Sequence, residues 1–253
     1  MQLSEFSSWL DALLVPSEFK DFCPDGLCVE ANDKVTRLVT GVSFSEDLVD
    51  AAIERKADCI LVHHLHGFWN NERRIPVGPL GRKLKKLFCN GICLYGFHLP
   101  LDGHIEVGNN AQIAKAFGLE SLEWYMMEGK RPIACTGRYA NAISAEGFLA
   151  KADAVFPKGF SRFLFGKKDI LKVAVCSGSA GMEGIEASIA QGADILVTGE
   201  IRESTPIFLK ENGFNLVAAG HYRTEVFGVR ALASKIESEL GIKAEFVDLD
   251  NPV

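Results

Sequence analysis

The stretch ADCILVHH at residues 57–64 decides the fold, because a near copy, ADILVTGE, occupies residues 193–200. In both stretches Ala-Asp leads into a short apolar run that ends in polar residues. Short apolar runs of this kind are typical of strands buried in a parallel sheet. A second pair follows in the same order, NGICL at 90–94 and NGFNL at 212–216. Two pairs of similar segments in the same order predict two related lobes.

Strand-like and helical runs alternate around these segments, which is typical of α/β folds with helical crossover connections. The expected strands are 35–42, 59–62, 92–97, 131–138, 171–176, 195–197, 216–219 and 244–249. The expected helices are 1–14, 46–55, 80–89, 110–117, 145–155, 184–190, 205–212 and 226–240. The aromatic and basic segment 156–168 is expected to be a loop. The sequence therefore predicts an α/β fold of two related lobes, residues 1–125 plus 226–253 and residues 126–225.

Length and composition narrow the class of protein. A chain of 253 residues with 47% hydrophobic and 24% charged residues can bury a substantial core. Its net charge of −6 disfavours binding to nucleic acid or to an anionic membrane through bulk charge. The start lacks the features of a signal peptide, and no apolar run reaches the roughly 18 residues of a membrane span. Seven cysteines without a CxxC pair are expected to be free thiols, so we expect a soluble cytoplasmic protein.

Histidines gather where the predicted strands end. His63 and His64 close one strand, His66 lies just beyond it, and His98 and His221 follow two other strands. Ligands of α/β proteins collect at the carboxyl ends of the strands. Adjacent strand residues point to opposite faces, so His63 and His64 can serve two different ions. The alternative is a set of structural histidines that only make hydrogen bonds.

A carboxylate stands four residues after each of the two later histidines, Asp102 after His98 and Glu225 after His221. This spacing places both side chains on one face of a helix. Pro100 indicates that the first pair crosses a loop instead, whereas Glu225 leads into a predicted helix. Imidazole and carboxylate together suit Zn, Mn, Fe, Co or Ni, and a carboxylate can bridge two ions. The pattern predicts a pair of divalent metal ions.

Two other features have both a functional and a structural interpretation. The turn SGSAG at 177–181 follows a strand and precedes a helix, so its amides either receive a phosphate or form a tight structural turn. The cationic residues of one predicted helix form either a solvated face or a substrate patch; they are Arg82, Lys83, Lys85 and Lys86. No nucleophile elbow and no complete P-loop motif occurs in the sequence.

Together these motifs resemble the GTP cyclohydrolase 1 type 2-like family, also called Nif-three-like proteins. The segments that carry the resemblance are DGL at 25–27, VHH at 62–64, GFW at 67–69, HLPLD at 98–102, GNNA at 108–111, TGE at 198–200 and GHYRTE at 220–225. They cover nearly the whole chain in order, and the bacterial members of about this length are the most similar.

The resemblance implies two α/β lobes with a dinuclear metal centre in the cleft between them, and a ring-shaped homohexamer. The family's ligands carry over onto His63, His64, Asp102, His221 and Glu225. Glu225 would be the bridging ligand, and His98 would support the site or carry a proton. His66 stands where an aromatic or apolar residue is common, and is either an extra site residue or a surface histidine.

Three functions fit this site. In the first, a metal-dependent hydrolase acts on a nucleotide or a similar small polar molecule, and His98 or Glu200 carries a proton. The resemblance associates this function with GTP ring opening or the handling of damaged nucleotides. A GTP cyclohydrolase zinc site of the cysteine and histidine type is not what this sequence presents. The second function is a non-catalytic hexameric scaffold or metal carrier that binds other proteins, and in the third the metals are purely structural.

Overall fold

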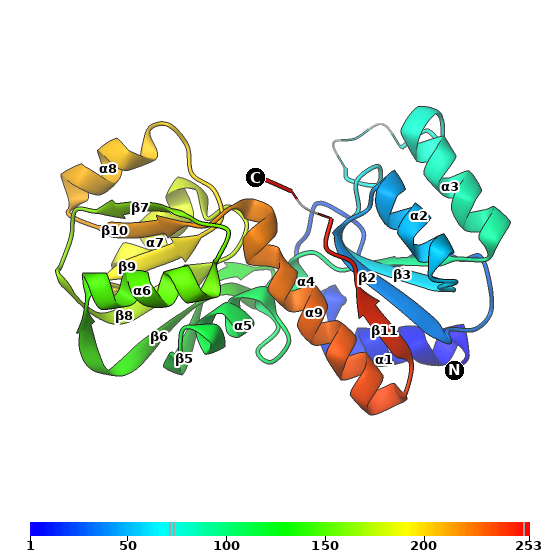
Figure 1. Cartoon of the computed structure of the whole chain (residues 1–253), viewed down its shortest axis with the longest axis horizontal. Coiled ribbons are helices and arrows are strands. Elements are labelled where there is room, and N and C mark those ends of the chain that lie inside the picture. Colours follow the sequence, from blue (N-terminus) through cyan, green and yellow to red (C-terminus); the bar gives the residue numbers. More distant parts are fainter. Residues whose placement is uncertain (71, 73, 250) are drawn as a thin grey trace. The chain divides into compact units, whose positions relative to one another are not determined.

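The computed structural model describes residues 1–70, 72, 74–249 and 251–253, and it contains two compact α/β units (Figure 1). Unit 1 comprises Met1–Leu101, Glu128–Lys130 and residues 228–249. Unit 2 comprises Asp102–Met127, Arg131–Phe227 and Asn251–Val253. Each unit has its own sheet and its own buried core.

Unit 1 is built on a five-stranded sheet with the strand order β1-β4-β3-β2-β11. Its centre consists of three parallel strands, β2 (Arg37–Ser43), β3 (Cys59–His64) and β4 (Cys93–Gly96). Strand β11 (Lys243–Phe246) adds to β2 in parallel, and β1 (Gly26–Val29) adds to β4 in the antiparallel direction. All six residues of β3 are buried, as expected for a strand covered on both faces.

Helices connect the parallel strands of unit 1. Helix α2 (Glu46–Glu54) joins β2 to β3, and α3 (Gly78–Asn90) joins β3 to β4. The backbone N–H of Leu48 donates to Ser45 Oγ, which caps the first turn of α2. The short helix α4 (Leu99–Gly103) follows β4. Before the first strand lie helix α1 (Leu3–Leu14) and the 3₁₀ turn η1 (Pro16–Glu18).

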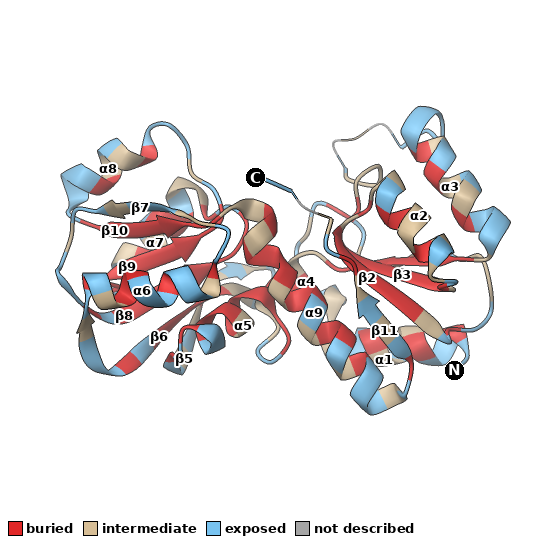
Figure 2. Ribbon diagram, in the orientation of Figure 1, coloured by how far each residue is buried: buried red, intermediate tan, exposed pale blue. Residues whose placement is uncertain are grey.

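Unit 2 is built on a six-stranded sheet with the strand order β5-β6-β8-β9-β10-β7. The strands are β5 (Glu120–Glu128), β6 (Arg131–Ser144), β8 (Asp169–Cys176), β9 (Ile195–Thr198), β10 (Asn215–Ala218) and β7 (Ser161–Leu164). Strands β8, β9 and β10 are parallel, whereas β6 and β7 pair with their neighbours β8 and β10 in the antiparallel direction. Strands β9 and β10 are buried along their length (Figure 2).

Helices α7 (Gly181–Ala190) and α8 (Thr205–Asn212) connect the parallel strands of unit 2. Helix α5 (Asn109–Ala116) packs on β6 and β8, and α6 (Ala145–Val155) follows β6. The long helix α9 (His221–Leu240) begins directly after β10, and its residues from 228 onward belong to unit 1.

The predicted α/β fold of two related lobes is confirmed. The chain follows the order β2-α2-β3-α3-β4 in one unit and β8-α7-β9-α8-β10 in the other, each time with parallel strands. The stretch at 57–64 forms β3 and the copy at 193–200 forms β9, which is the middle strand of its set.

Three local predictions were wrong. Segment 156–168 contains β7, an edge strand whose mostly exposed residues lack the apolar alternation of a half-buried strand. Residues 102–125 belong to unit 2 because β5 joins the six-stranded sheet and α5 packs on it. Pro100 does not prevent a helix, since proline is tolerated in the first turn, and α4 therefore spans the loop predicted there.

Two further predictions concerned membrane-spanning helices and cysteine pairing. Within the described ranges, no helix is both long and apolar enough to cross a membrane. All seven cysteines are described, and all are unpaired, as predicted.

Candidate metal centre

Three histidines of unit 1 converge at the carboxyl ends of two neighbouring strands. His63 and His64 are the last residues of β3, and His98 follows the end of β4. Because β3 and β4 are parallel neighbours, their ends meet at one edge of the sheet. One ring nitrogen from each histidine lies within 4.8 Å of the other two. His63 and His64 are 0% and 7% exposed, so these imidazoles are not solvated surface groups.

Hydrogen bonds fix the orientation of these rings. His63 Nδ1 lies 2.9 Å from the carbonyl oxygen of Phe97, and His64 Nδ1 lies 3.4 Å from Ser43 Oγ. An imidazole whose Nδ1–H donates to a carbonyl presents Nε2 as the metal-binding nitrogen. The local structure of β3 and β4 therefore prepares His63 for a metal ion.

Asp21 is a site residue that sequence reasoning missed. His98 Nδ1 lies 3.0 Å from Asp21 Oδ1, and the backbone N–H of Leu99 donates to Asp21 Oδ2 at 2.9 Å. Burial raises the pKa of Asp21, but the hydrogen bond and charge of His98 and the backbone N–H donors outweigh it and lower the pKa. Asp21 lies in a segment without periodicity, and the only nearby signal was the DGL motif at 25–27.

The side chain of Asp25, the first residue of that motif, binds the backbone of the same histidine. The N–H of His98 donates to Asp25 Oδ1 at 2.9 Å. Burial and the charge of Asp21 raise the pKa of Asp25 to about 7, against weaker opposing effects of His98 and His63. Two acidic side chains thus hold His98 in place, which fits the predicted role as a proton carrier beside a metal.

His66 lies beside this histidine group. Its ring centroid is 5.7 Å from that of His64 and 4.8 Å from that of Trp69, and its side chain is partly exposed. Its carbonyl oxygen accepts a hydrogen bond from Lys83 Nζ at 3.0 Å. The structure therefore places His66 near the candidate site, and a role there stays a prediction.

In unit 2, helix α9 brings His221 and Glu225 together. The two residues are one turn apart, and His221 Nε2 lies 3.1 Å from Glu225 Oε1. Glu200, which follows β9, lies 3.4 Å from His221 Nδ1. Burial lowers the pKa of His221, but its hydrogen bond to Glu225 and the charges of Glu225 and Glu200 outweigh it and raise the pKa to about 9. A divalent cation would replace the proton that His221 carries among these carboxylates.

Asp102 is the second buried carboxylate of unit 2. It lies in α4 and is 7% exposed, and one of its oxygens lies within 4.8 Å of a Glu225 oxygen. Asn109 Nδ2 and Ser177 Oγ each donate to Asp102 Oδ1 at 2.9 Å. Unit 2 therefore contributes two buried carboxylates and one histidine to the predicted ligand set.

Most backbone amides of the turn at 177–181 donate hydrogen bonds within the protein. The N–H of Ser177 donates to Asn110 Oδ1 at 2.7 Å, and the N–H of Gly178 donates to Thr224 Oγ1 at 2.9 Å. The N–H of Ala180 donates to Thr198 Oγ1 at 3.2 Å. Because three of the five amides of the turn are bound within the protein, the structural interpretation is favoured.

Three of the four cationic residues predicted on α3 are engaged within unit 1, whereas Lys85 is exposed. Arg82 pairs with Glu46 and Lys86 pairs with Asp50, each at 2.5 Å. Lys83, expected on a solvated face, is only 6% exposed and donates to the carbonyl oxygen of Phe44 at 2.9 Å. Its ammonium also lies 3.9 Å from the centre of the Phe44 ring, so backbone and ring contacts satisfy the buried charge.

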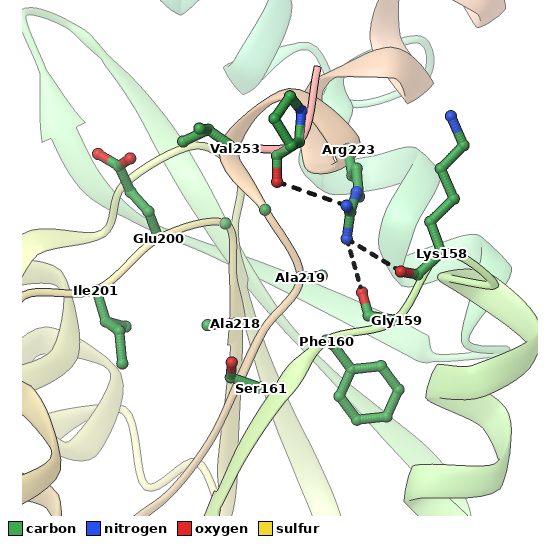
Figure 3. Close-up of a pocket in the computed structure, with 13 residues that line it drawn as sticks. Lys158, Gly159, Phe160, Ser161, Glu200, Ile201, Ala218, Ala219, Arg223 and Val253 are labelled. Carbon is green, nitrogen blue, oxygen red and sulfur yellow. Dashed lines mark hydrogen bonds between the residues drawn. The ribbon is translucent and has the colours of Figure 1, made fainter. Parts of the chain in front are cut away.

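A pocket of about 430 Å³ opens in unit 2, and its lining includes Gly220, the residue before His221 (Figure 3). It lies at the carboxyl ends of β9 and β10, where Ala218, Ala219 and Glu200 line it. Arg223 braces its rim by donating to the carbonyl oxygens of Lys158 and Gly159 at 3.3 and 3.1 Å. A volume of this size accommodates a small molecule.

The five predicted ligands thus fall into two sets, His63 and His64 in unit 1 and Asp102, His221 and Glu225 in unit 2, and all but the partly exposed His221 are buried. Nitrogen and carboxylate donors, without a participating thiolate, suit Zn, Mn, Fe, Co or Ni. These buried groups could hold a metal ion, and the role of each residue stays a prediction.

Comparison with known proteins assigns the chain to a family. The sequence model of the family described as Duf34/NIF3 (NGG1p interacting factor 3) matches residues 1–252. The chain is therefore a member of the Duf34/NIF3 family, as its motifs predicted.

Individual relatives agree with this assignment. A Pseudomonas aeruginosa protein named GTP cyclohydrolase 1 type 2 homolog is 39% identical over 253 residues, which cover 99% of this chain and 98% of that protein. A Haemophilus influenzae protein of the same name is 36% identical over 249 residues, 98% of each chain. The crystal structure of a Thermus thermophilus protein matches over 100% of both chains, with a TM-score of 0.88 and 32% identity.

Proposed function

We propose that this protein is a metal-dependent hydrolase that binds two divalent ions through His63, His64, Asp102, His221 and Glu225. The observation that carries the proposal is the grouping of ligand-type side chains in each unit. In unit 1 the buried His63 and His64 end strand β3. In unit 2 the buried carboxylates of Asp102 and Glu225 lie with the partly exposed His221. Burying so many ionisable groups is costly unless they are paired or coordinate a metal.

The substrate we propose is a nucleotide or a similar small polar molecule. The pocket in unit 2 has the size of a small-molecule site, and it offers both a carboxylate, Glu200, and an apolar floor, Ala218 and Ala219. The relatives named GTP cyclohydrolase 1 type 2 homolog point to the same substrate class.

Bound metal would supply a water molecule of lowered pKa as the nucleophile. The protein's own residues would orient the substrate and move protons. The Asp21 carboxylate holds His98 Nδ1, and the His98 ring lies 5.1 Å from the His63 ring and 5.6 Å from the His64 ring, centroid to centroid. We therefore assign the proton-transfer role to His98, with Glu200 as the second candidate beside His221.

The test combines metal analysis with turnover assays. The wild-type protein should bind two divalent ions per chain and hydrolyse at least one member of a nucleotide and phosphoester panel. His98→Gln should retain both ions and lose turnover by about 10²–10⁴-fold, the usual contribution of a general acid or base. His104→Asn is the matched control, because His104 Nδ1 accepts the backbone N–H groups of Glu106 and Val107, and asparagine keeps an acceptor.

The competing function is a metal carrier or a non-catalytic scaffold. A metal-loaded protein without turnover on the whole panel, but with ready transfer of its metal to an apo-acceptor, would replace the hydrolase proposal with the carrier. A scaffold role remains an alternative for two reasons. The family is described as an interacting factor, and the resemblance implies a homohexamer. We also propose a cytoplasmic location, supported by the seven unpaired cysteines.

A further inference from the structure

Ser177 is a buried residue whose hydroxyl group binds a candidate metal ligand. It directly follows β8 and is 8% exposed. Its backbone N–H is anchored on Asn110 Oδ1, and Asn110 in turn donates to the carbonyl oxygen of Ile133 at 2.6 Å. Its side chain donates to Asp102 Oδ1 at 2.9 Å. A hydroxyl can donate one hydrogen bond, and Ser177 donates it to the Asp102 carboxylate.

Asn109 donates to the same oxygen from another segment of the chain. Its Nδ2 lies 2.9 Å from Asp102 Oδ1, and its side chain is 0% exposed. Two donors on one oxygen restrict the orientation of the Asp102 carboxyl group.

The next residue of the turn, Gly178, touches the other two ligands of unit 2. Its φ is +62°, and a Cβ built there would collide with Glu225 Oε1 and lie 3.0 Å from His221 Nε2. Its N–H donates to Thr224 Oγ1, and Thr224 lies between His221 and Glu225 on α9. One short turn therefore contacts all three predicted ligands of unit 2.

We propose that Ser177 is a positioning residue for the metal site, and that the Ser177–Gly178 turn shapes the ligand set of unit 2. This inference rests on the metal binding in the proposed function, but not on hydrolysis. Groups that orient a metal ligand from behind contribute about 10–100-fold to metal affinity. The turn that the sequence offered as a phosphate site thus acts on the metal ligands instead.

Ser177→Ala and Ser179→Ala form a matched pair, because Ser179 belongs to the same turn but is exposed. The affinity of the full-length, metal-free protein for Co²⁺ and Zn²⁺ is measured by competition with a chelator, and the visible spectrum of bound Co²⁺ reports its coordination. Ser177→Ala should weaken binding of one ion about 10–100-fold and alter the Co²⁺ spectrum. Ser179→Ala should match the wild type. Equal affinities of the two variants would overturn the proposal.

Asn109→Ala tests the same idea without touching the turn. It should weaken metal binding in the same range, and the double variant with Ser177→Ala should bind more weakly than either single one. If Ser177→Ala does not fold when metal-free, an unchanged affinity in Asn109→Ala is the refuting result. Wild-type protein that takes up no metal overturns this inference together with the metal site. Wild-type protein that binds metal without turnover refutes only the hydrolase, and the serine pair still decides the inference.

Discussion

Replacing Gly178 by alanine tests whether the turn at 177–181 is built around the ligands His221 and Glu225. The chain offers a matched control in Gly181, because both glycines have a left-handed backbone, with φ of +62° and +61°. The new Cβ at 178 would collide with Glu225 Oε1. Among the residues that the structure describes, none comes within 4 Å of a Cβ at 181.

Both substitutions place alanine in a left-handed backbone conformation, but only one of them also crowds its neighbours. A left-handed conformation costs an L-residue about 1–2 kcal/mol, and both variants bear this cost. Crowding in a close-packed interior adds about 1–3 kcal/mol, and only Gly178→Ala bears it. We therefore expect Gly178→Ala to lower the free energy of unfolding by about 2–5 kcal/mol and Gly181→Ala by about 1–2 kcal/mol.

Urea unfolding of the metal-free proteins measures the stability difference, and chelator competition measures metal affinity. Glu225 must move to admit the methyl group at 178, so Gly178→Ala should also lose metal affinity, by about tenfold or more, while Gly181→Ala keeps it. Equal stabilities together with equal metal affinities would refute the crowding argument and the packing of the turn against Glu225.

Three further predictions concern other parts of the chain. Phe148→Ala should lower the free energy of unfolding by about 3–5 kcal/mol in urea titrations. The reason is that Phe148 is 0% exposed and stacks on Phe117, with 5.1 Å between the ring centroids. A loss below about 1 kcal/mol would contradict this packing. Burial raises the pKa of Asp194, but the hydrogen bonds from Lys167 Nζ and the backbone N–H groups of Lys172 and Leu171 outweigh it and lower the pKa. Its carboxylate therefore stabilises the fold above about pH 4 and stops doing so as the pH falls through its folded pKa. Asp194→Asn should cost about 1–3 kcal/mol at pH 7, and the difference from wild type should shrink toward about pH 2; a difference independent of pH would count against the ionic role. Of the seven cysteines only Cys89 is exposed, so a thiol reagent should label one site rapidly in the native protein and none in Cys89→Ser; several fast sites would contradict the described burial.

The central strands were predictable because their sequence signal and their burial have the same cause. Residues 59–62 and 195–197 are apolar because β3 and β9 are covered on both faces. The polar residues that close these runs mark the strand ends, which is why His63 and His64 could be picked out as site residues. Edge strand β7 gave no such signal, because most of its residues are exposed.

Residues whose role depends on a tertiary partner were harder to predict. Asp21 and His98 are 77 residues apart in the sequence, and no local sequence pattern predicts their contact. Lys83 looked like a surface charge, and its burial depends on two carbonyl oxygens and the Phe44 ring from other segments. Asp102 was identified as a ligand, but the donors Asn109 and Ser177 that hold it could be found only from the structure.

The order of segments has a consequence for how the chain emerges during synthesis. Unit 1 is made of residues 1–101 and 228–249 with a short piece at 128–130, so unit 2 is inserted into it. Strand β11 reaches its partner β2 only after residue 246 has been made, whereas the six strands of unit 2 are all present by residue 218. Domains usually fold in the order in which they leave the ribosome, from the N-terminus onward. Here the inserted unit can complete its sheet before the unit that begins the chain, so Asp102, His221 and Glu225 can be assembled while the sheet bearing His63 and His64 still lacks its edge strand.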